Sequence, residues 1–96
     1  AASDVYKRQA RGDLKSIHQF ISQDSRASAD AFIELLFEKT ELLLNSPLIG
    51  RMVPEIKYPE IREIILKNYR VVYKTEESRI IILTVFEGHR QLNLDT

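Results

Sequence analysis

The side chains best suited to chemistry lie in the second half of the sequence, on or beside three apolar segments: Arg62, Tyr69, Arg70, Tyr73, His89 and Arg90. An arginine can hold a phosphate or a carboxylate through two parallel hydrogen bonds. A histidine titrates near neutral pH and can move a proton. Gly88 precedes His89 and permits a sharp bend that would aim the last two side chains. These residue types suggest a rim that binds an anion and could transfer a proton.

Each of these residues also has a structural interpretation, and spacing alone does not decide between the two. Arg70 could pair across strands with Glu63, and His89 could be a solvated residue at a strand end. The two tyrosines could be half-buried packing residues. His18 lies on the flank of a helical apolar stripe, and we expect a structural role for it. No catalytic constellation follows from the spacing.

The composition predicts one small domain without a metal or cofactor. The chain has 96 residues, of which 44% are hydrophobic, an ordinary share for a soluble globular protein. No apolar run approaches the roughly 18 residues that a membrane helix needs. Cysteine is absent, which excludes disulfides and thiolate sites and fits a reducing cytoplasm. Two histidines supply no metal-ligand pattern. We therefore predict a cytoplasmic protein.

The charge balance argues against a protein that depends on nucleic-acid backbone contacts. The chain carries 14 lysines and arginines against 14 aspartates and glutamates. Binding to phosphate backbones usually requires a clear basic excess.

The first nine residues, AASDVYKRQ, differ from everything that follows. They carry no helical stripe and only a weak alternation. The codons GCA GCG TCA GAT GTG TAT AAG AGA CAG would encode all nine, and that string resembles a transposon adapter used in sequencing libraries. We interpret residues 1–9 as a non-native segment, read through from the adapter in a metagenomic fragment. The alternative is a genuine polar tail. If residues 1–9 are non-native, the native domain spans residues 10–96.

Two helices are expected before the strands. The stretch from Ala10 to about Asp24 has apolar residues at the helical period, and a stronger stripe runs from Ser28 to about Asn45. Leu35 and Leu42 widen the second stripe, so we expect that helix to be covered on more than one face. The polar break DSRAS between them is short, which predicts an antiparallel helical hairpin.

Three strands are expected after a proline-rich loop. Pro47 ends the second helix, and SPLIGRMVPEIKYPE is predicted to be a loop. The segments IREIIL, YRVVYK and RIIILTVF are short, β-branched and aromatic, which indicates strands at 61–66, 69–74 and 79–86. Lys67–Asn68 can form the first turn, with Asn68 tolerating positive φ. The result is an antiparallel meander.

Strict alternation in the last strand places two apolar sets on opposite faces. Thr84 and Phe86 would join Ile80 and Ile82 on one face, whereas the other face would carry Ile81, Leu83 and Val85. Two helices can cover only one face of a small sheet. We therefore expect the face that bears Ile81, Leu83 and Val85, or the opposite face, to stay partly open in the isolated chain and to be covered by a partner.

The chain resembles the ParE/RelE superfamily of type II toxin–antitoxin toxins, on its ParE-like side. The resemblance is carried by SPLIGRMVPE, IREIIL, NYRVVYK and IIILTVFEGHRQL, in that order. It implies an α+β fold of β-α-α-β-β-β order, with a helical hairpin on an antiparallel sheet. The family's first strand falls where AASDVYKRQ stands, so the native first strand would be replaced or missing. A cognate antitoxin would wrap over the toxin and neutralise it.

The superfamily divides in function, and the resemblance gives the candidate residues two sets of roles. RelE-like members cut messenger RNA on the ribosome with basic residues. Arg70 and Arg90 match two such arginines, Arg62 falls near a catalytic lysine position, and His89 lies beside Arg90. A second lysine position falls near Ile64, and the expected C-terminal tyrosine is absent. ParE-like members resemble the chain more closely and are associated with poisoning DNA gyrase.

Three hypotheses follow from the resemblance. The first is a ParE-like toxin whose rim residues bind a cytoplasmic target, DNA gyrase, or the antitoxin: Arg62, Tyr69, Arg70, Tyr73, His89 and Arg90. The second is a ribosome-dependent ribonuclease acting on messenger RNA. The third is an inactive fragment with the toxin fold.

Overall fold

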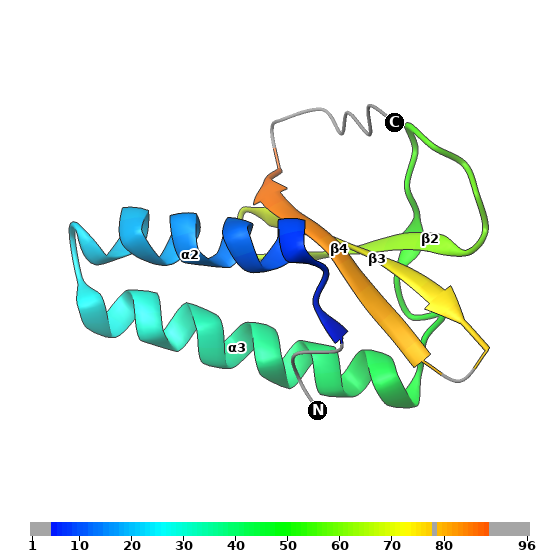
Figure 1. The fold of residues 1–96 in the computed structure, drawn as a ribbon, viewed down its shortest axis with the longest axis horizontal. Helices are drawn as coiled ribbons and strands as arrows, with labels where there is room; N and C mark the ends of the chain where they lie inside the picture. The colour runs from blue at the N-terminus through cyan, green and yellow to red at the C-terminus, as the bar shows by residue number, and fades with distance from the viewer. Residues whose placement is uncertain (1–4, 78, 89–96) are drawn as a thin grey trace.

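The computed structural model describes residues 5–77 and 79–88 (Figure 1). Two helices, α2 (Arg8–Ser22) and α3 (Arg26–Asn45), run side by side as a hairpin on one face of a four-stranded antiparallel sheet. The sheet order is β1-β2-β3-β4, formed by Arg51–Met52, Ile61–Leu66, Tyr69–Glu76 and Arg79–Glu87. The predicted α+β class, helical hairpin and meander are confirmed. No described helix is both long and apolar enough to cross a membrane.

The helices begin earlier than the sequence predicted. Helix α2 starts at Arg8 and α3 at Arg26, so the break between them is shorter than DSRAS. Ser25 ends the break, because its side chain accepts a hydrogen bond from the backbone N–H of Ser28 at 3.1 Å. His18 lies 2.7 Å from Asp30 and joins the two helices, which agrees with a structural role.

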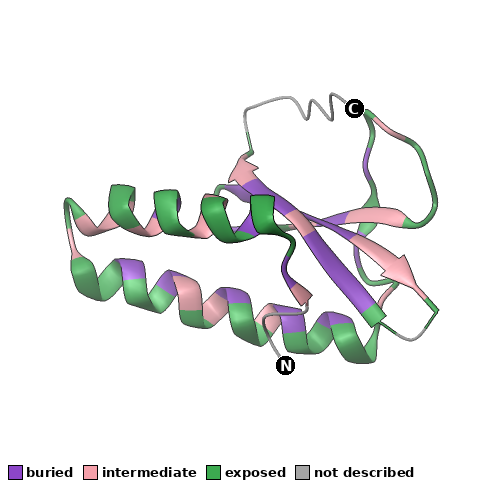
Figure 2. Cartoon of the chain, in the orientation of Figure 1, coloured by how far each residue is buried: buried purple, intermediate pink, exposed green. Residues whose placement is uncertain are grey.

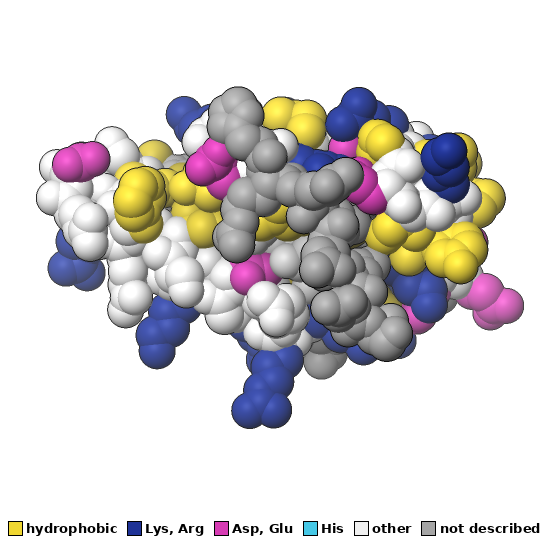
Figure 3. All heavy atoms as spheres, turned by 90° about the horizontal axis from the view of Figure 1, so that it is seen from above, with side chains coloured by type: hydrophobic (Ala, Val, Ile, Leu, Met, Phe, Trp, Pro, Cys, Tyr) yellow, Lys and Arg dark blue, Asp and Glu magenta, His cyan; other side chains and the backbone are white. Residues whose placement is uncertain are grey.

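Helix α3 buries one stripe, half-buries Ile33 and Leu35 beside it, and leaves other apolar side chains in solvent. Its buried positions are Ala29, Phe32, Leu36, Thr40 and Leu43. Phe37, Leu42 and Leu44 are about half exposed, so among the described residues the expected cover over a second face is partial: it includes Leu35 but not Leu42. Seen from above, hydrophobic side chains lie at the surface over α2 and over the loop after β1 (Figure 3).

The N-terminal residues contribute to the core, although they do not form a full strand. Tyr6 makes a single parallel bridge with Ile82, and the Lys7 N–H donates to the Ile82 carbonyl at 2.9 Å. The Tyr6 hydroxyl is buried 2.8 Å from Thr40 Oγ1. An extended segment can occupy any open sheet edge, so these contacts do not test whether residues 1–9 are native.

The sheet departs from the predicted meander in three places. A two-residue strand, β1, lies inside the predicted loop and pairs Arg51 with Glu63. In the turn after β2 the positive φ belongs to Lys67, at 56°, and not to Asn68. The third difference is a register shift in β4: Val72 faces Thr84, whereas Tyr73 faces Ile82. One residue of β4, Leu83, is therefore extra.

This β-bulge corrects the predicted faces of β4. An extra residue reverses the alternation beyond it, and Val85 accordingly joins Ile80 and Ile82 in the helix-facing core. Strand β4 is largely buried (Figure 2). Ile81 and Val85 are almost fully buried, and among the apolar residues of β4 only Leu83 and Phe86 are half-buried. The expectation of an open face is therefore wrong for most of β4. The open position lies instead in β2, where Ile65 is 55% exposed.

Candidate functional site

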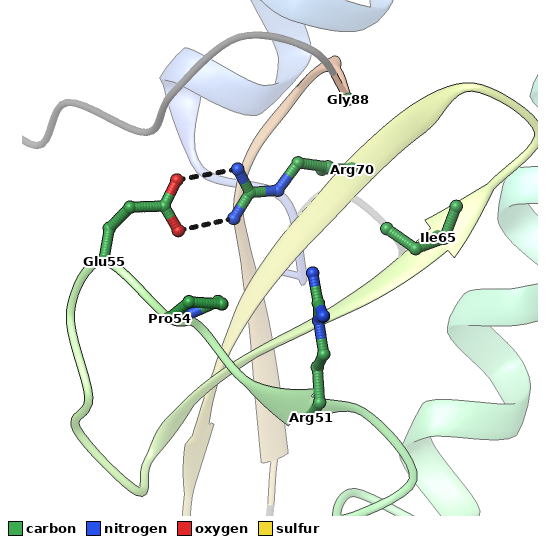
Figure 4. A pocket seen from close by; sticks show the side chains of 6 residues that line it. All are labelled: Arg51, Pro54, Glu55, Ile65, Arg70 and Gly88. Atoms are coloured by element: carbon green, nitrogen blue, oxygen red, sulfur yellow. Dashed lines mark hydrogen bonds and ion pairs between the residues drawn. The ribbon is translucent and has the colours of Figure 1, made fainter.

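A pocket of about 450 Å³ lies on the sheet face opposite the helices. Arg70 points into it from β3, beside its cross-strand neighbour Ile65 in β2. Arg51 reaches it from β1, and Glu55 reaches it from the loop after β1 (Figure 4). Pro54 and Gly88 complete the described lining.

Arg70 is held by two carboxylates and an aromatic ring. Its Nη1 and Nη2 donate to the two carboxylate oxygens of Glu55, each at 2.8 Å, as Figure 4 shows. Its Nε and Nη2 lie 2.7 and 2.6 Å from Glu63 Oε1. The guanidinium carbon stands 5.1 Å from the centre of the Phe86 ring. The hydrogen bonds that Arg70 donates to Glu55, and then those to Glu63, raise the pKa of Arg70 against the opposing effect of burial. Arg70 is therefore a charged cation with several partners.

Arg51 completes this group from the solvent side. Its Nε and Nη2 lie 2.7 and 2.6 Å from Glu63 Oε2. The Glu63 side chain has no exposed area, whereas that of Arg51 is 62% exposed. Two arginines therefore satisfy one buried carboxylate, which is the condition under which a buried charge is tolerated.

A second set of contacts fixes the chain at Gly50. The buried Tyr73 hydroxyl donates to the Pro47 carbonyl at 2.6 Å and accepts from the Gly50 N–H at 2.9 Å. Arg62 Nη1 donates to the Gly50 carbonyl at 2.8 Å. Burial raises the pKa of Tyr73. A Cβ at Gly50 would stand 2.5 Å from the Tyr73 hydroxyl oxygen, so only glycine fits there.

These two sets of contacts form one unit, which we call the loop clamp: Gly50, Arg51, Glu55, Arg62, Glu63, Arg70 and Tyr73. The segment GRMVPE, which includes β1, supplies the first three residues. The second and third strands supply the other four, in IRE and YRVVY. The short motifs that make this sequence distinctive therefore hold one another, and they fasten the loop to the sheet.

Of the six candidate residues, four lie in the described part of the chain. Arg62 and Tyr73 meet at Gly50, and Arg70 lies in the pocket. Tyr69 faces the helices, where its ring centre lies 5.1 Å from that of Phe32. Burial, and then the charge of Glu87, raises the pKa of Tyr69. His89 and Arg90 lie outside the described residues.

The pairing of Arg70 with Glu63 is confirmed, but the part played by Glu55 was missed. The sequence signal was available in the charge order. An arginine and a glutamate flank MVP in this segment, and another such pair follows in IRE. Opposite charges at matching positions of two motifs indicate contact between them. The same charge order in the two motifs also indicates that Arg51 takes part.

A second hollow of about 280 Å³ lies between α2 and the ends of β3 and β4. Apolar and acidic side chains line it: Asp13, Ser16, Ile17, Phe20, Tyr69, Val85, Phe86 and Glu87. No group of three metal-ligating side chains is present among the residues that the structure describes. The described residues that line the two hollows include no histidine; they hold charges and present apolar surface.

Comparison with known proteins places this arrangement in a family. A family model for the "ParE toxin of type II toxin-antitoxin system, parDE" matches residues 5–92. A solved structure, "Chromosomal ParDE TA system from P. aeruginosa", matches with a TM-score of 0.68 and 19% identity. The match covers 85% of this chain and 90% of that one, and at this identity it supports the fold alone. No curated protein matches. Because the family model spans nearly the whole sequence, the chain belongs to the ParE toxins of type II toxin–antitoxin systems.

Proposed function

We propose that this toxin inhibits growth in the cytoplasm by binding DNA gyrase, and that a cognate antitoxin neutralises it. Membership of the ParE family supports the role of toxin and implies an antitoxin partner. The choice of gyrase rests on the closer likeness to ParE-like than to RelE-like sequences.

The observation that supports the proposal most directly is that the charge of Arg70 is balanced by partners within the fold. In a RelE-like ribonuclease this arginine would stabilise the extra negative charge that develops on the scissile phosphate. Here two carboxylates and the face of Phe86 already surround it. A cation whose charge is balanced within the fold offers little stabilisation to a second anion. The described site therefore favours inhibition by binding over cleavage.

The proposal is tested by inducing the chain in a bacterial host and measuring two products. A gyrase poison leaves DNA breaks covalently linked to gyrase, and messenger RNA stays intact in primer extension. Cleaved messenger RNA without linked breaks would contradict the proposal and support the ribonuclease. Absence of both products, with no effect on growth, would indicate an inactive fragment. Neutralisation is tested by co-expressing the small protein encoded beside the toxin.

Arg90 is the residue that we expect to contact the target or the antitoxin. This expectation comes from the GHR motif of the sequence, because the residue lies outside the described part. Replacing Arg90 with alanine should remove growth inhibition while the melting temperature stays nearly constant. A large fall in melting temperature would assign Arg90 to the fold instead.

A further inference from the structure

The pocket beside the loop clamp has one cationic group that faces solvent. The side chain of Arg51 is 62% exposed, although its Nε and Nη2 are engaged with Glu63. Within the described ranges, the hydrogen bonds and ion pairs of this guanidinium are those that Nε and Nη2 make with Glu63. The buried Glu63 carboxylate fixes the guanidinium in place, so a ligand would not have to order it. Such preorganisation lowers the entropic cost of binding.

An apolar surface lies next to this guanidinium. Ile65 lines the same pocket and is 55% exposed, although it lies within β2 (Figure 4). Strand β1 pairs only with Arg62 and Glu63, so no described strand runs beside Ile65 on that side of β2. The sheet therefore has an open stretch here that an extended segment can approach.

We propose that this pocket is the seat for an acidic side chain of the antitoxin, carried on an extended segment. Its carboxylate binds the outer edge of Arg51, and an adjacent aliphatic side chain covers Ile65. The inference rests on the proposed neutralisation by an antitoxin, and it adds the chemistry by which the antitoxin is recognised.

The surrounding charges favour a protein carboxylate over a nucleic-acid backbone. Two guanidinium groups, Arg51 and Arg70, are balanced by two carboxylates, Glu55 and Glu63. A polyanionic backbone is held by several uncompensated cations, and the described lining of the pocket does not supply them. A single carboxylate needs only one oriented guanidinium edge, and Arg51 supplies it. The aliphatic stem of a glutamate also matches the apolar lining from Ile65 and Pro54.

The test uses the full chain with labelled isoleucine methyl groups and arginine Nε–H groups, observed by NMR. The probe is the peptide Ac-Val-Leu-Glu-Leu-Val-NH2, and its counterpart carries glutamine in place of glutamate. We expect the glutamate peptide to shift the Ile65 methyl and Arg51 Nε–H signals, and the glutamine peptide to bind at least about tenfold more weakly. A decathymidylate strand serves as the nucleic-acid arm.

Two variants test the residues themselves without removing the partner of Glu63. Arg51→Lys keeps a cation beside Glu63 but loses the forked edge, and Ile65→Thr alters only an exposed side chain. Each should weaken the glutamate peptide by about tenfold or more. Lys15→Gln, an exposed change on α2, is the matched control and should leave binding unchanged.

Equal binding of the two peptides, binding unchanged by Arg51→Lys, or shifts caused by the decathymidylate at the same signals would each overturn the inference. Growth assays separate it from the proposed function. If Arg51→Lys still poisons gyrase and the neighbouring antitoxin still neutralises it fully, the seat is refuted and the proposed function stands. If the parent chain forms no gyrase-linked breaks but binds the glutamate peptide, the choice of gyrase fails instead.

Discussion

Arg70 and Glu55 face each other through two parallel hydrogen bonds of 2.8 Å, one from each terminal nitrogen of the guanidinium. Glu55 belongs to the loop after β1, and Arg70 to the middle of the sheet. Their side chains are 18% and 8% exposed. This geometry maximises the strength of an arginine–carboxylate pair. It makes Arg70 the point at which the loop is fastened to the sheet.

We expect Arg70→Ala to destabilise the fold strongly. The change strands the fully buried Glu63 carboxylate beside a single remaining partner, and breaking a buried pair costs about 3–5 kcal/mol. For a domain of this size each kcal/mol lowers the melting temperature by about 4–8 °C, so calorimetry should show a fall of more than 10 °C. Arg26→Ala, at an exposed position of α3, is the control. A loss of only a degree or two in Arg70→Ala would contradict a structural role.

Gly50 and Gly12 form a matched pair for alanine substitution. A Cβ at Gly50 would lie 2.5 Å from the Tyr73 hydroxyl oxygen and 2.7 Å from the Glu63 carbonyl oxygen. Overpacking of this kind costs about 1–3 kcal/mol. A Cβ at Gly12, inside α2, meets nothing within 4 Å, so Gly12→Ala should stabilise by about 0.5–1 kcal/mol. Urea unfolding measures the stability of both variants. If Gly50→Ala were as stable as Gly12→Ala, close packing of Gly50 in the loop clamp would be contradicted.

The elements of this fold could be predicted because local patterns specify them. The apolar period changes from helical to alternating after the proline-rich loop, and this located both helices and three strands to within a few residues. Features that depend on contacts distant in sequence could not be predicted in this way. The bulge at Leu83 is one example, because a register shift is set by the partner strand and by the helix packed on it.

The charged contacts of the candidate site also could be predicted only in part. Residue type and motif identified Arg70, and its pairing with Glu63 was expected. The four-residue charge group of Arg51, Glu55, Glu63 and Arg70, with Glu63 and Arg70 buried, was not predicted. Buried charges are rare unless every partner is present. Glu55 is 15 residues from Arg70 in sequence, and only the folded loop brings it close. Motif residues that bind one another are therefore easily mistaken for residues that bind a ligand.

Asp13 should stabilise the bulged strand. Its Oδ2 accepts hydrogen bonds from Thr84 Oγ1 at 2.6 Å and from the Val85 N–H at 2.9 Å. Asp13→Ala leaves both donors without this acceptor, and the expected cost is about 1–3 kcal/mol. Hydrogen exchange of the Val85 amide, followed by NMR, should accelerate. Asp24→Ala, at an exposed position of the helix turn, should change neither quantity. Unchanged exchange in Asp13→Ala would show that the bulge does not depend on the carboxylate.

Alkaline pH should destabilise the protein through its buried tyrosines. Burial favours the neutral phenol in the folded state and raises the pKa of Tyr6, Tyr69 and Tyr73 above the value of about 10 in the unfolded chain. Below pH 10 both states keep these protons, so the stabilisation is fully present. Above pH 10 the unfolded chain releases protons that the folded chain retains, and the free energy of unfolding falls as pH rises.

Tyr73→Phe should make this fall shallower. The variant loses stability at pH 8, by about 1–3 kcal/mol, because the Gly50 N–H and the Pro47 carbonyl lose their shared hydroxyl partner. Between pH 10 and 11, however, one titrating group fewer contributes to its pH dependence. Tyr58→Phe removes an exposed tyrosine and should retain the slope of the parent. Urea unfolding at pH values from 8 to 11 measures how the stability of the parent and of the two variants depends on pH. An equal slope in Tyr73→Phe and the parent would mean that Tyr73 is not the group whose proton the fold retains.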